Sequence, residues 1–398
     1  MDQMTPSNGV RWGILSLCAL TVIVVYTIPT LMLPVLFPEI AADLNLDVVQ
    51  LGIAWGSLSL SSIVVGLFGG AIADRLGSRK MITVVCLLTG LLGGLRGFAP
   101  NFVFLVGSLI IYGLVAPSFP PILHKTGAHL FPNQRGISTG VISLGFAFAL
   151  FLGSRYTATL LSPLVGGWRN VLFMFGGLGV LFSAIWFLAI PKQFLPPPTN
   201  SDKPFFNSIF STVQQVLKVR EMWIIGIGST LFWACFRGFT GYTPLYLRGL
   251  GLSAVEADNA LSGFFLASLI LALPLSFLAE RLGYRRPFLV LAMLLTGGGV
   301  LFLGSGNEAW IPLAIIVAGL MFDAFMAIHQ AEVLDLKGVG AYTGSALGLL
   351  VMFREIGGVL SPPIGNWMAQ FNPSIPYFFW GGAALLAAIV FLLLPRRS

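Results

Sequence analysis

The chain has 398 residues, of which 56% are hydrophobic and 9% are charged, against about 25% charged residues in a typical soluble protein. A soluble domain could not bury so much apolar surface, whereas a lipid bilayer accommodates it. The composition therefore excludes an ordinary soluble protein. The net charge of +7 has to be interpreted from where the charges lie.

Hydrophobic runs of membrane-spanning length follow one another from end to end of the chain. Each is close to the roughly 20 residues that a helix needs to cross the hydrocarbon core. We therefore predict an all-α membrane protein with twelve transmembrane helices, near residues 12–36, 49–72, 81–97, 102–124, 136–162, 170–190, 222–247, 254–279, 287–305, 309–334, 341–367 and 374–394.

Basic residues gather between alternate runs, and most of the 22 lie on the side that also holds both chain ends. The opposite side carries Arg96, Arg169 and Arg248 in its loops, together with several acidic residues. This asymmetry follows the positive-inside rule and predicts a multi-pass protein of the cell's inner (plasma) membrane with both termini in the cytoplasm. The basic balance thus reports orientation in the lipid bilayer, and it implies no nucleic-acid partner.

Two charged octets, "ADRLGSRK" at 73–80 and "AERLGYRR" at 279–286, occupy equivalent places. The first joins the second and third runs, and the second joins the eighth and ninth. Their shared order of acid, Arg, Leu, Gly and basic pair indicates that six helices are repeated in parallel. Repeats of that kind are typical of secondary transporters.

A polar, proline-rich stretch follows the sixth run and begins "PKQFLPPPTNSDKPFF". Because proline cannot continue a helix, we place a division here. The predicted parts are an N-terminal six-helix bundle at 1–190, a cytoplasmic linker at 191–221 and a C-terminal six-helix bundle at 222–398. Residues 205–218 have helical spacing of apolar positions, so a surface helix and a flexible linker are both compatible with this stretch.

The first octet and its surroundings resemble the signature loop of the major facilitator superfamily, and the second resembles the copy in the family's other half. The phrase "GGWRNVLF" that opens the sixth run resembles the family too. The resemblance covers the whole chain and implies a secondary transporter with two pseudo-symmetric bundles that works by alternating access. The residues that carry it, with a conformational gating role, are Gly70, Asp74, Arg75, Gly77, Arg79, Lys80, Glu280, Arg281, Gly283, Arg285 and Arg286.

In the family, the acid of each loop docks on the start of a helix in the other half. The resemblance implies that Asp74 meets the start of the eleventh span and Glu280 the start of the fifth. A carboxylate is stabilised at a helix N-terminus by the helix dipole, and the glycines permit the tight turn. These contacts exist only while the cytoplasmic side is closed, so they would bias a two-state equilibrium without touching substrate.

Five charged residues are the clear candidates for charges deep inside the predicted spans: Arg155, Arg237, Asp323, Arg354 and Glu355. Each such charge costs about 2.5–3.5 kcal/mol on insertion scales, so each needs a reason to be there. In the superfamily, the first and fourth helices of each half line the cavity and the second and fifth border it. All five residues fall on such helices, so we expect them to face a polar interior.

Arg237 shares a helical face with Trp233 and Gly241, which predicts an aromatic wall, a guanidinium and an open space. The run "FRGFTGYTPLYL" is similar to the seventh span of the organophosphate:phosphate antiporters and related anion porters, where an Arg holds the substrate anion. Those porters carry a second Arg in the first span, where this chain offers Tyr26. A smaller, carboxylate-type anion therefore fits better than a phosphorylated one.

The predicted substrate-binding residues are Arg237, Arg354, Trp233, Tyr242, Tyr26, Tyr112 and Arg155. Tyr112 stands in the fourth span, where proton-coupled members of the superfamily commonly carry an Arg. Asp323 could pair with Arg354 on the adjacent helix. Arg354 and Glu355 point about 100° apart and should meet different partners. Glu355 and Asp323 are the candidates for a proton-coupling group, and a purely structural role is the alternative for both.

The sequence leaves several functions open. A transporter of a small organic anion, an exporter of a hydrophobic or drug-like compound in the same fold, and a non-transporting receptor are all compatible with it. We expect no enzyme, cofactor or metal, because no zinc-ligand pair, nucleophile elbow or phosphate-binding loop occurs. The expected partners are a small anionic solute, the bilayer and protons, and we expect a monomer.

Overall fold

The computed structural model describes residues 7–191, 194–196, 213–306, 308–336, 339 and 343–395, with the side chains of 67–76 and 343–344 outside the description. Within these residues every regular element is a helix, as the composition predicts.

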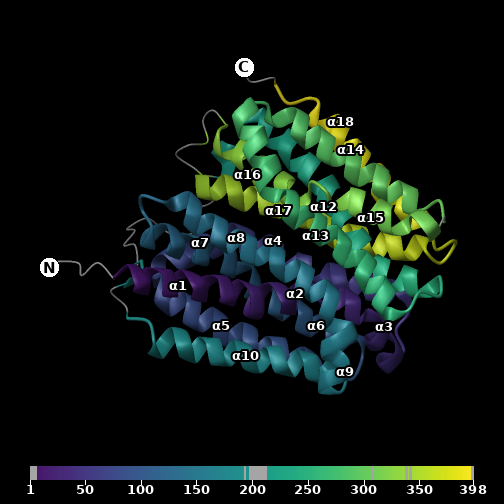
Figure 1. The fold of residues 1–398 in the computed structure, drawn as a ribbon, viewed down its shortest axis with the longest axis horizontal. Coiled ribbons are helices and arrows are strands. Elements are labelled where there is room, and N and C mark those ends of the chain that lie inside the picture. The colour runs from purple at the N-terminus through teal and green to yellow at the C-terminus, as the bar shows by residue number, and fades with distance from the viewer. Residues whose placement is uncertain are drawn as a thin grey trace.

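The first half of the chain forms six membrane-length segments, several of them built from more than one helix. In chain order they are α1, α2 and α3 (Asn8–Thr21, Ile28–Leu31 and Leu33–Leu44), α4 (Val48–Leu76), α5 (Ser78–Leu95), α6 and α7 (Phe102–Gly113 and Phe119–Leu130), α8 and α9 (Arg135–Tyr156 and Ser162–Val165) and α10 (Trp168–Leu188). They lie together as the purple-to-teal bundle of Figure 1.

The second half forms the green-to-yellow bundle. Its helices are α12 (Arg220–Gly249), α13 (Ala254–Leu282), α14 (Arg285–Leu303), α15 and α16 (Ile311–Gly319 and Phe322–Leu334), α17 (Thr343–Met368) and α18 (Ile375–Phe391). In the described part of the chain, 11 segments are long and apolar enough to cross a membrane, and α18 is a shorter apolar helix. The predicted all-α layout of twelve spans is confirmed.

The linker falls largely outside the description. Of the predicted surface helix at 205–218, residues 205–212 are not described and 213–216 are helical.

Three of the spans are interrupted near their middle. The first contains a π-helical turn at Val22–Thr27 and breaks at Met32, where Pro34 cannot donate a hydrogen bond to the preceding turn. The fourth breaks between α6 and α7, and the tenth between α15 and α16. Interrupted helices leave backbone groups free in the bundle interior, and in transporters such breaks mark the binding region.

Arg96 differs from its expected place in an outer loop. It lies in a 3-10 turn at the end of α5 and is 0% exposed. Its guanidinium lies 3.9 Å from the centroid of the Tyr112 ring, and its Nη1 donates to the carbonyl of Pro29 at 3.1 Å. Because the broken first span frees a carbonyl for this donor, the arginine can be buried without an acidic partner.

The start of α1 and the end of α18 lie on the left and upper side of Figure 1, where the bundles diverge, which we name the terminal end; the opposite end, which holds the C-terminal ends of α3 and α12, is the distal end. The bundles meet at the distal end, where α4 packs on α17. A Cβ atom on Gly52 would lie 2.7 Å from the carbonyl oxygen of Pro362, and Asn366 donates to the carbonyl of Val48 at 2.8 Å. Glycine is therefore required for this close helix contact.

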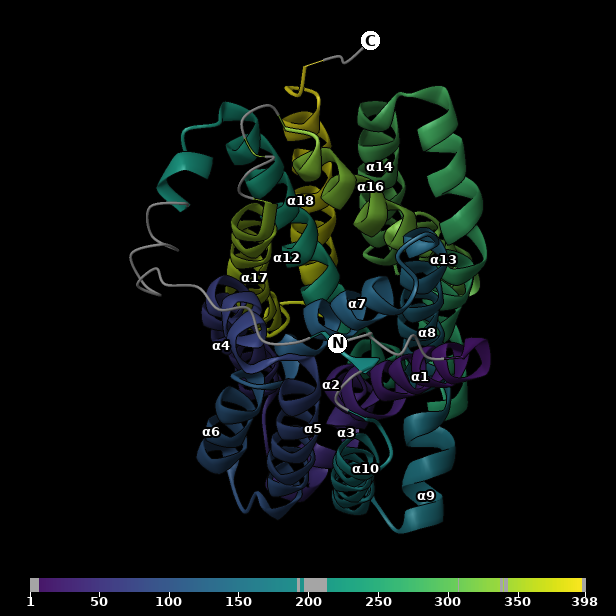
Figure 2. The same ribbon diagram turned by 90° about the vertical axis from the view of Figure 1, so that its left-hand side faces the viewer.

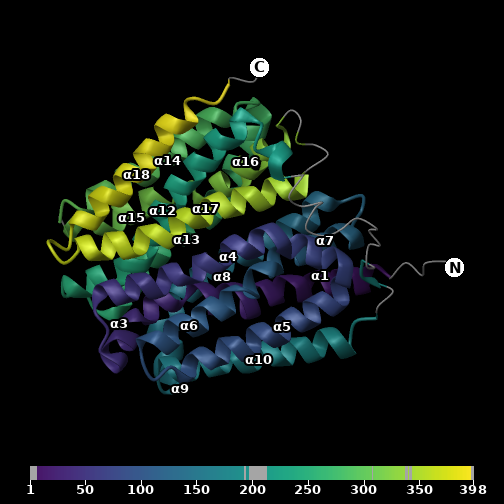
Figure 3. The ribbon, with the colours of Figure 1, turned by 180° about the vertical axis from the view of Figure 1, so that it is seen from behind.

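The bundles diverge toward the terminal end, as the views from the front and from behind show (Figures 1 and 3). Seen from that end, the helices of the second half lie above those of the first (Figure 2). Glu280 and Arg135 at the start of α8 are both exposed, and no hydrogen bond or ion pair joins them among the described residues. The docking of Glu280 that the resemblance implies for a closed terminal end stays a prediction, and the side chain of Asp74 lies outside the description.

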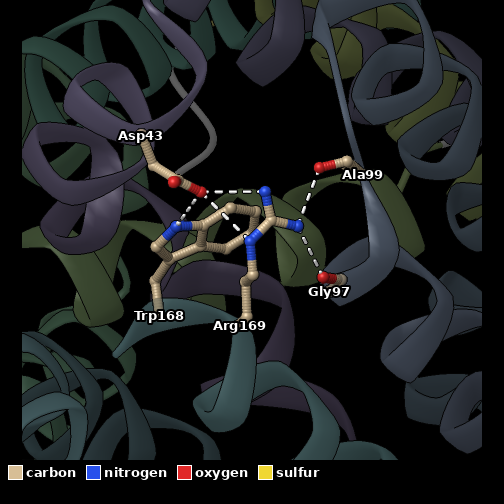
Figure 4. Close-up of polar contacts among 5 residues, drawn as sticks. All are labelled: Asp43, Gly97, Ala99, Trp168 and Arg169. Atoms are coloured by element: carbon tan, nitrogen blue, oxygen red, sulfur yellow. Dashed lines mark hydrogen bonds and ion pairs between the residues drawn. The ribbon is translucent and has the colours of Figure 1, made fainter. Parts of the chain in front are cut away.

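A network of polar contacts joins three spans at the distal end of the first bundle (Figure 4). Positive φ angles at Gly166 and Gly167 turn the chain into α10 and bring Trp168 and Arg169 against Asp43. Arg169 Nη2 lies 2.8 Å from Asp43 Oδ2, and Arg169 Nη1 donates to the carbonyls of residues 97 and 99, each at 2.8 Å. One guanidinium therefore joins the first, third and sixth spans.

We predict that Arg169→Ala lowers the free energy of unfolding by about 2 kcal/mol, because it removes several charge-assisted hydrogen bonds to backbone and carboxylate at once. Arg169→Lys should cost about half as much, since an ammonium keeps the charge but not the fork of donors. Thermal unfolding of the purified protein measures both. Arg135→Ala, which removes an exposed guanidinium, is the control, and equal losses in all three variants would contradict the prediction.

Candidate functional site

Arg237 lies at the contact between the two bundles. Arg237 is 3% exposed, and its guanidinium carbon lies 3.6 Å from the centroid of the Trp55 ring on α4. Arg237 Nη2 donates to the carbonyl of Trp55 at 3.1 Å, and Trp55 Nε1 donates to the carbonyl of Arg237 at 2.9 Å. The open space expected beside Gly241 is occupied, since a Cβ there would lie 2.5 Å from Trp55 Cδ1.

Arg354 on α17 forms the second cationic position. Its guanidinium lies 4.2 Å from the centroid of the Trp233 ring, and its Nη2 lies 3.5 Å from Glu355 Oε1. The side chain of Arg354 is 17% exposed and that of Glu355 is 9% exposed. The two neighbours contact each other, and Arg354 also contacts the Trp233 ring; the expectation that they meet different third partners stays a prediction.

Tyr26 completes this group from the first bundle. It lies in the π-helical turn of the first span, a feature that often marks functional positions. Its ring packs on Phe119 and Phe146, and its hydroxyl interacts with Arg354, Glu355 and Arg237 through long-range electrostatics, with no hydrogen bond to them among the described residues. We name the set Tyr26, Trp233, Arg237, Arg354 and Glu355 the central cluster.

The central cluster keeps unused hydrogen-bond donors. Arg237 Nε, Arg354 Nε and Trp233 Nε1 are all buried and have no hydrogen-bond partner in the described structure. Among the described residues, no acid lies within ion-pair distance of Arg237, and the contact of Arg354 with Glu355 is long. Buried donors of a charged group are costly to leave unpaired, so the cluster is suited to accept a partner with negatively charged oxygens.

Three of the predicted substrate-binding residues lie apart from this cluster. Tyr112 is fully buried in the first bundle, where its hydroxyl lies 2.8 Å from Thr30 Oγ1. Tyr242 donates to the carbonyl of Pro373 at 3.2 Å and packs in an aromatic group inside the second bundle. Arg155 lies near the distal end of α8, where its guanidinium carbon is 5.1 Å from the centroid of the Tyr156 ring.

Asp323 does not contact Arg354. Asp323 Oδ2 accepts a hydrogen bond of 2.6 Å from Ser268 Oγ, which in turn accepts one of 2.8 Å from the backbone N–H of Asp323. This reciprocal pair joins the start of α16 to α13. The carboxylate is oriented by that contact and lies outside the central cluster, which leaves Glu355 as the acid of the cluster.

The gating residues lie where the octets place them, at the terminal end. Gly77 and Gly283 have φ angles of 76° and 68°, which explains why glycine ends α4 and α13. Arg79 donates to the carbonyl of Phe187, and Arg285 pairs with Asp335, so each of these arginines binds within its own bundle. Three of the remaining residues are exposed: Lys80, Glu280 and Arg281. Arg286 is half-buried. The structure does not describe the surroundings of Gly70, Asp74 and Arg75.

Sequence reasoning missed two residues of this region, Trp55 and Arg96. The signal for Trp55 was available as a tryptophan in the second span, but its partner stands 182 positions later in the chain. Arg96 stands at the end of the predicted third span, and its full burial differs from the outer-loop position expected for it. Within the described residues, no group of three or more potential ligands could hold a metal ion.

Two helical bundles that contain broken spans and enclose buried charges form the architecture of a secondary transporter. Comparison with known proteins agrees with this class. The sequence profile described as "Major Facilitator Superfamily" matches residues 15–259 and 248–398, so the chain belongs to that superfamily and is a multi-pass membrane protein.

Relatives and solved structures support the same assignment. The chain is 25% identical to the probable galactarate/D-glucarate transporter GudP of Escherichia coli strain K12, with 89% of this chain and 87% of the relative covered. It is 24% identical to the probable nitrate/nitrite antiporter NarK1 of Thermus thermophilus, with 91% and 86% covered. Its fold matches a bacterial homologue of the human lysosomal transporter Spinster, in an inward-facing and unoccupied conformation, with a TM-score of 0.75, 16% identity, and 98% and 96% of the two chains covered.

Proposed function

We propose that this protein moves a small organic anion across the membrane by rocking its two bundles around the central cluster. The observation that carries the proposal is the pair of guanidinium groups at Arg237 and Arg354, buried on aromatic faces with unpaired donors. With Glu355 as the acid beside them, the three groups sum to one net positive charge. An anion that enters would receive the hydrogen bonds that the protein leaves unmade.

The relatives support an anionic substrate without defining it. One is named for galactarate and D-glucarate, which are dicarboxylates, and another for nitrate and nitrite. These solutes share negatively charged, planar groups of oxygen atoms. The planar fork of a guanidinium matches such groups with two parallel hydrogen bonds. A carboxylate-type organic anion is therefore our proposed cargo, carried in a plasma or inner membrane.

The positive-inside pattern supports cytoplasmic termini, so we propose that the terminal end faces the cytoplasm. In that orientation this structure, with its bundles joined at the distal end and diverging at the terminal end, is an inward-facing state. A hydrophobic or drug-like cargo is the second candidate within the same fold. Two buried cations disfavour a cationic drug, and no feature of the central cluster favours a non-transporting receptor.

Glu355 is our candidate for a proton-coupling residue. It is the acid that contacts Arg354, and it lies within electrostatic range of Arg237. An incoming carboxylate would compete with Glu355 for the same guanidinium. Protonation of Glu355 would remove that competition, so proton and anion binding would favour each other through one shared contact.

The first test is a thermal-shift and isothermal-titration screen of nitrate, monocarboxylates, and the dicarboxylates galactarate and D-glucarate on the purified protein. We predict that the best anion binds about 10- to 100-fold more weakly to Arg237→Ala and to Arg354→Ala, because each variant loses a charge-assisted hydrogen-bonding group. Arg220→Ala, which removes an exposed guanidinium from the same helix as Arg237, should bind normally. Undiminished binding in both site variants would overturn the anion-site assignment.

The second test separates transport from coupling. In proteoliposomes, Glu355→Gln should abolish anion accumulation driven by a pH gradient and retain counterflow exchange of the same anion, because the glutamine resembles a permanently protonated acid. Asp323→Asn, which alters the other candidate acid, is the comparison and should retain gradient-driven accumulation. If accumulation survives in Glu355→Gln and is lost in Asp323→Asn, the coupling role belongs to Asp323.

A further inference from the structure

The contact between Trp55 and Arg237 is reciprocal and crosses the two bundles. Each residue donates a side-chain hydrogen bond to the backbone carbonyl of the other, at 2.9 and 3.1 Å, and the guanidinium also lies on the indole ring at 3.6 Å. Both residues are buried. Two hydrogen bonds and a cation–π contact thus join one residue of α4 to one residue of α12.

The surroundings of Trp55 are shaped to receive its ring. Gly241, one turn after Arg237, leaves the space that the ring occupies, since a Cβ there would approach Trp55 Cδ1 to 2.5 Å. Phe37 packs edge-on against the other side of the indole, with ring centroids 6.2 Å apart. A cavity of about 20 Å³ borders Trp55. It is lined by Val35, Phe236 and other residues of both bundles.

Alternating access requires this contact to break. The two bundles are joined at the distal end, so opening that end separates α4 from α12. Trp55 would then leave the guanidinium of Arg237, whose Nη2 would lose its carbonyl partner. The same arginine would gain unpaired donors in one state that it lacks in the other.

We propose that Trp55 is a positioning residue that competes with the transported anion for the Arg237 guanidinium. It holds the guanidinium while the distal end is closed and gives it up when that end opens. The proposal rests on the anion-transport function above and adds a state dependence to it. The anion binds more tightly when the distal end is open and is released more readily when the Trp55 contact re-forms, because a ligand shifts a conformational equilibrium by its difference in affinity for the two states.

The first experiment measures closure of the distal end without any ligand. A reporter cysteine at Val35→Cys, in a chain whose three buried native cysteines are replaced by alanine, is labelled with N-ethylmaleimide in detergent. Val35 is buried at the contact between the bundles, so labelling reports the separated state. Gly241→Ala should raise the labelling rate about fivefold or more, because its methyl group overlaps the Trp55 ring.

The control is Gly249→Ala, which adds the same methyl group to the same helix where nothing lies within 4 Å. Both variants replace a glycine of α12 by alanine, and a faster labelling rate in Gly241→Ala alone reports the overlap with Trp55. If Gly241→Ala fails to fold, Trp55→Phe replaces it, since loss of the indole donor should also raise the rate about threefold. Equal labelling rates in the variants and the control overturn the proposal.

The second experiment measures competition by titrating galactarate and nitrate onto the same proteins. Trp55→Phe should bind the anion about threefold more tightly than the wild type, because phenylalanine is a weaker cation–π partner for the Arg237 guanidinium and the indole hydrogen bond to the Arg237 carbonyl is lost. Trp186→Phe, which removes another buried indole whose Nε1 donates to Thr21 Oγ1 at 3.0 Å, should bind as the wild type does. A merely structural role would lower thermal stability without tightening binding.

The outcomes separate the two proposals. Faster labelling with unchanged or weaker anion binding in Trp55→Phe overturns the competition. If no anion binds the wild type, the transport proposal fails and the competition fails with it, while the labelling rates still decide whether Trp55 controls closure of the distal end.

Discussion

The structure depends on how a guanidinium is kept inside an apolar bundle. A charged side chain at the centre of a membrane span is costly unless nearby groups solvate it. Arg237 is surrounded by an indole face and a backbone carbonyl, and Arg354 by an indole face and the carboxylate of Glu355. Glu355 balances one of the two positive charges and leaves one in excess. In the proposed function, that excess charge is what an incoming anion would meet.

Arginine side chains bound by aromatic rings and backbone carbonyls also occur where no substrate is expected. Arg96 is buried over the Tyr112 ring and donates to a carbonyl freed by the break in the first span. Arg169 donates to two loop carbonyls and to Asp43. Arg96 also keeps one buried donor, Nη2, without a partner among the described residues, so what sets Arg237 apart is its position against the other bundle. Arg169 is bound to an acid inside one bundle, whereas Arg237 faces the other bundle and has a buried Nε without a partner.

Most of the fold could be predicted from the sequence, because membrane-length apolar runs and the repeated octets are local patterns. The glycines that end α4 and α13 were also predictable, since a positive φ angle requires them. The sequence predicted several residues of the candidate site but not the contacts that each of them makes. Arg354 contacts both Trp233 and Glu355, whereas Tyr112, Tyr242 and Arg155 have other partners and Asp323 contacts Ser268.

By itself, the sequence determined the all-α class, the number of spans, the internal duplication and the presence of charges that need a polar interior. Each of these follows from hydrophobicity, spacing and charge along a short stretch of chain. Only the tertiary structure decided which group each charge contacts. Trp55 and Arg237 are 182 positions apart and belong to different bundles, so their meeting depends on how the bundles pack and not on any local pattern.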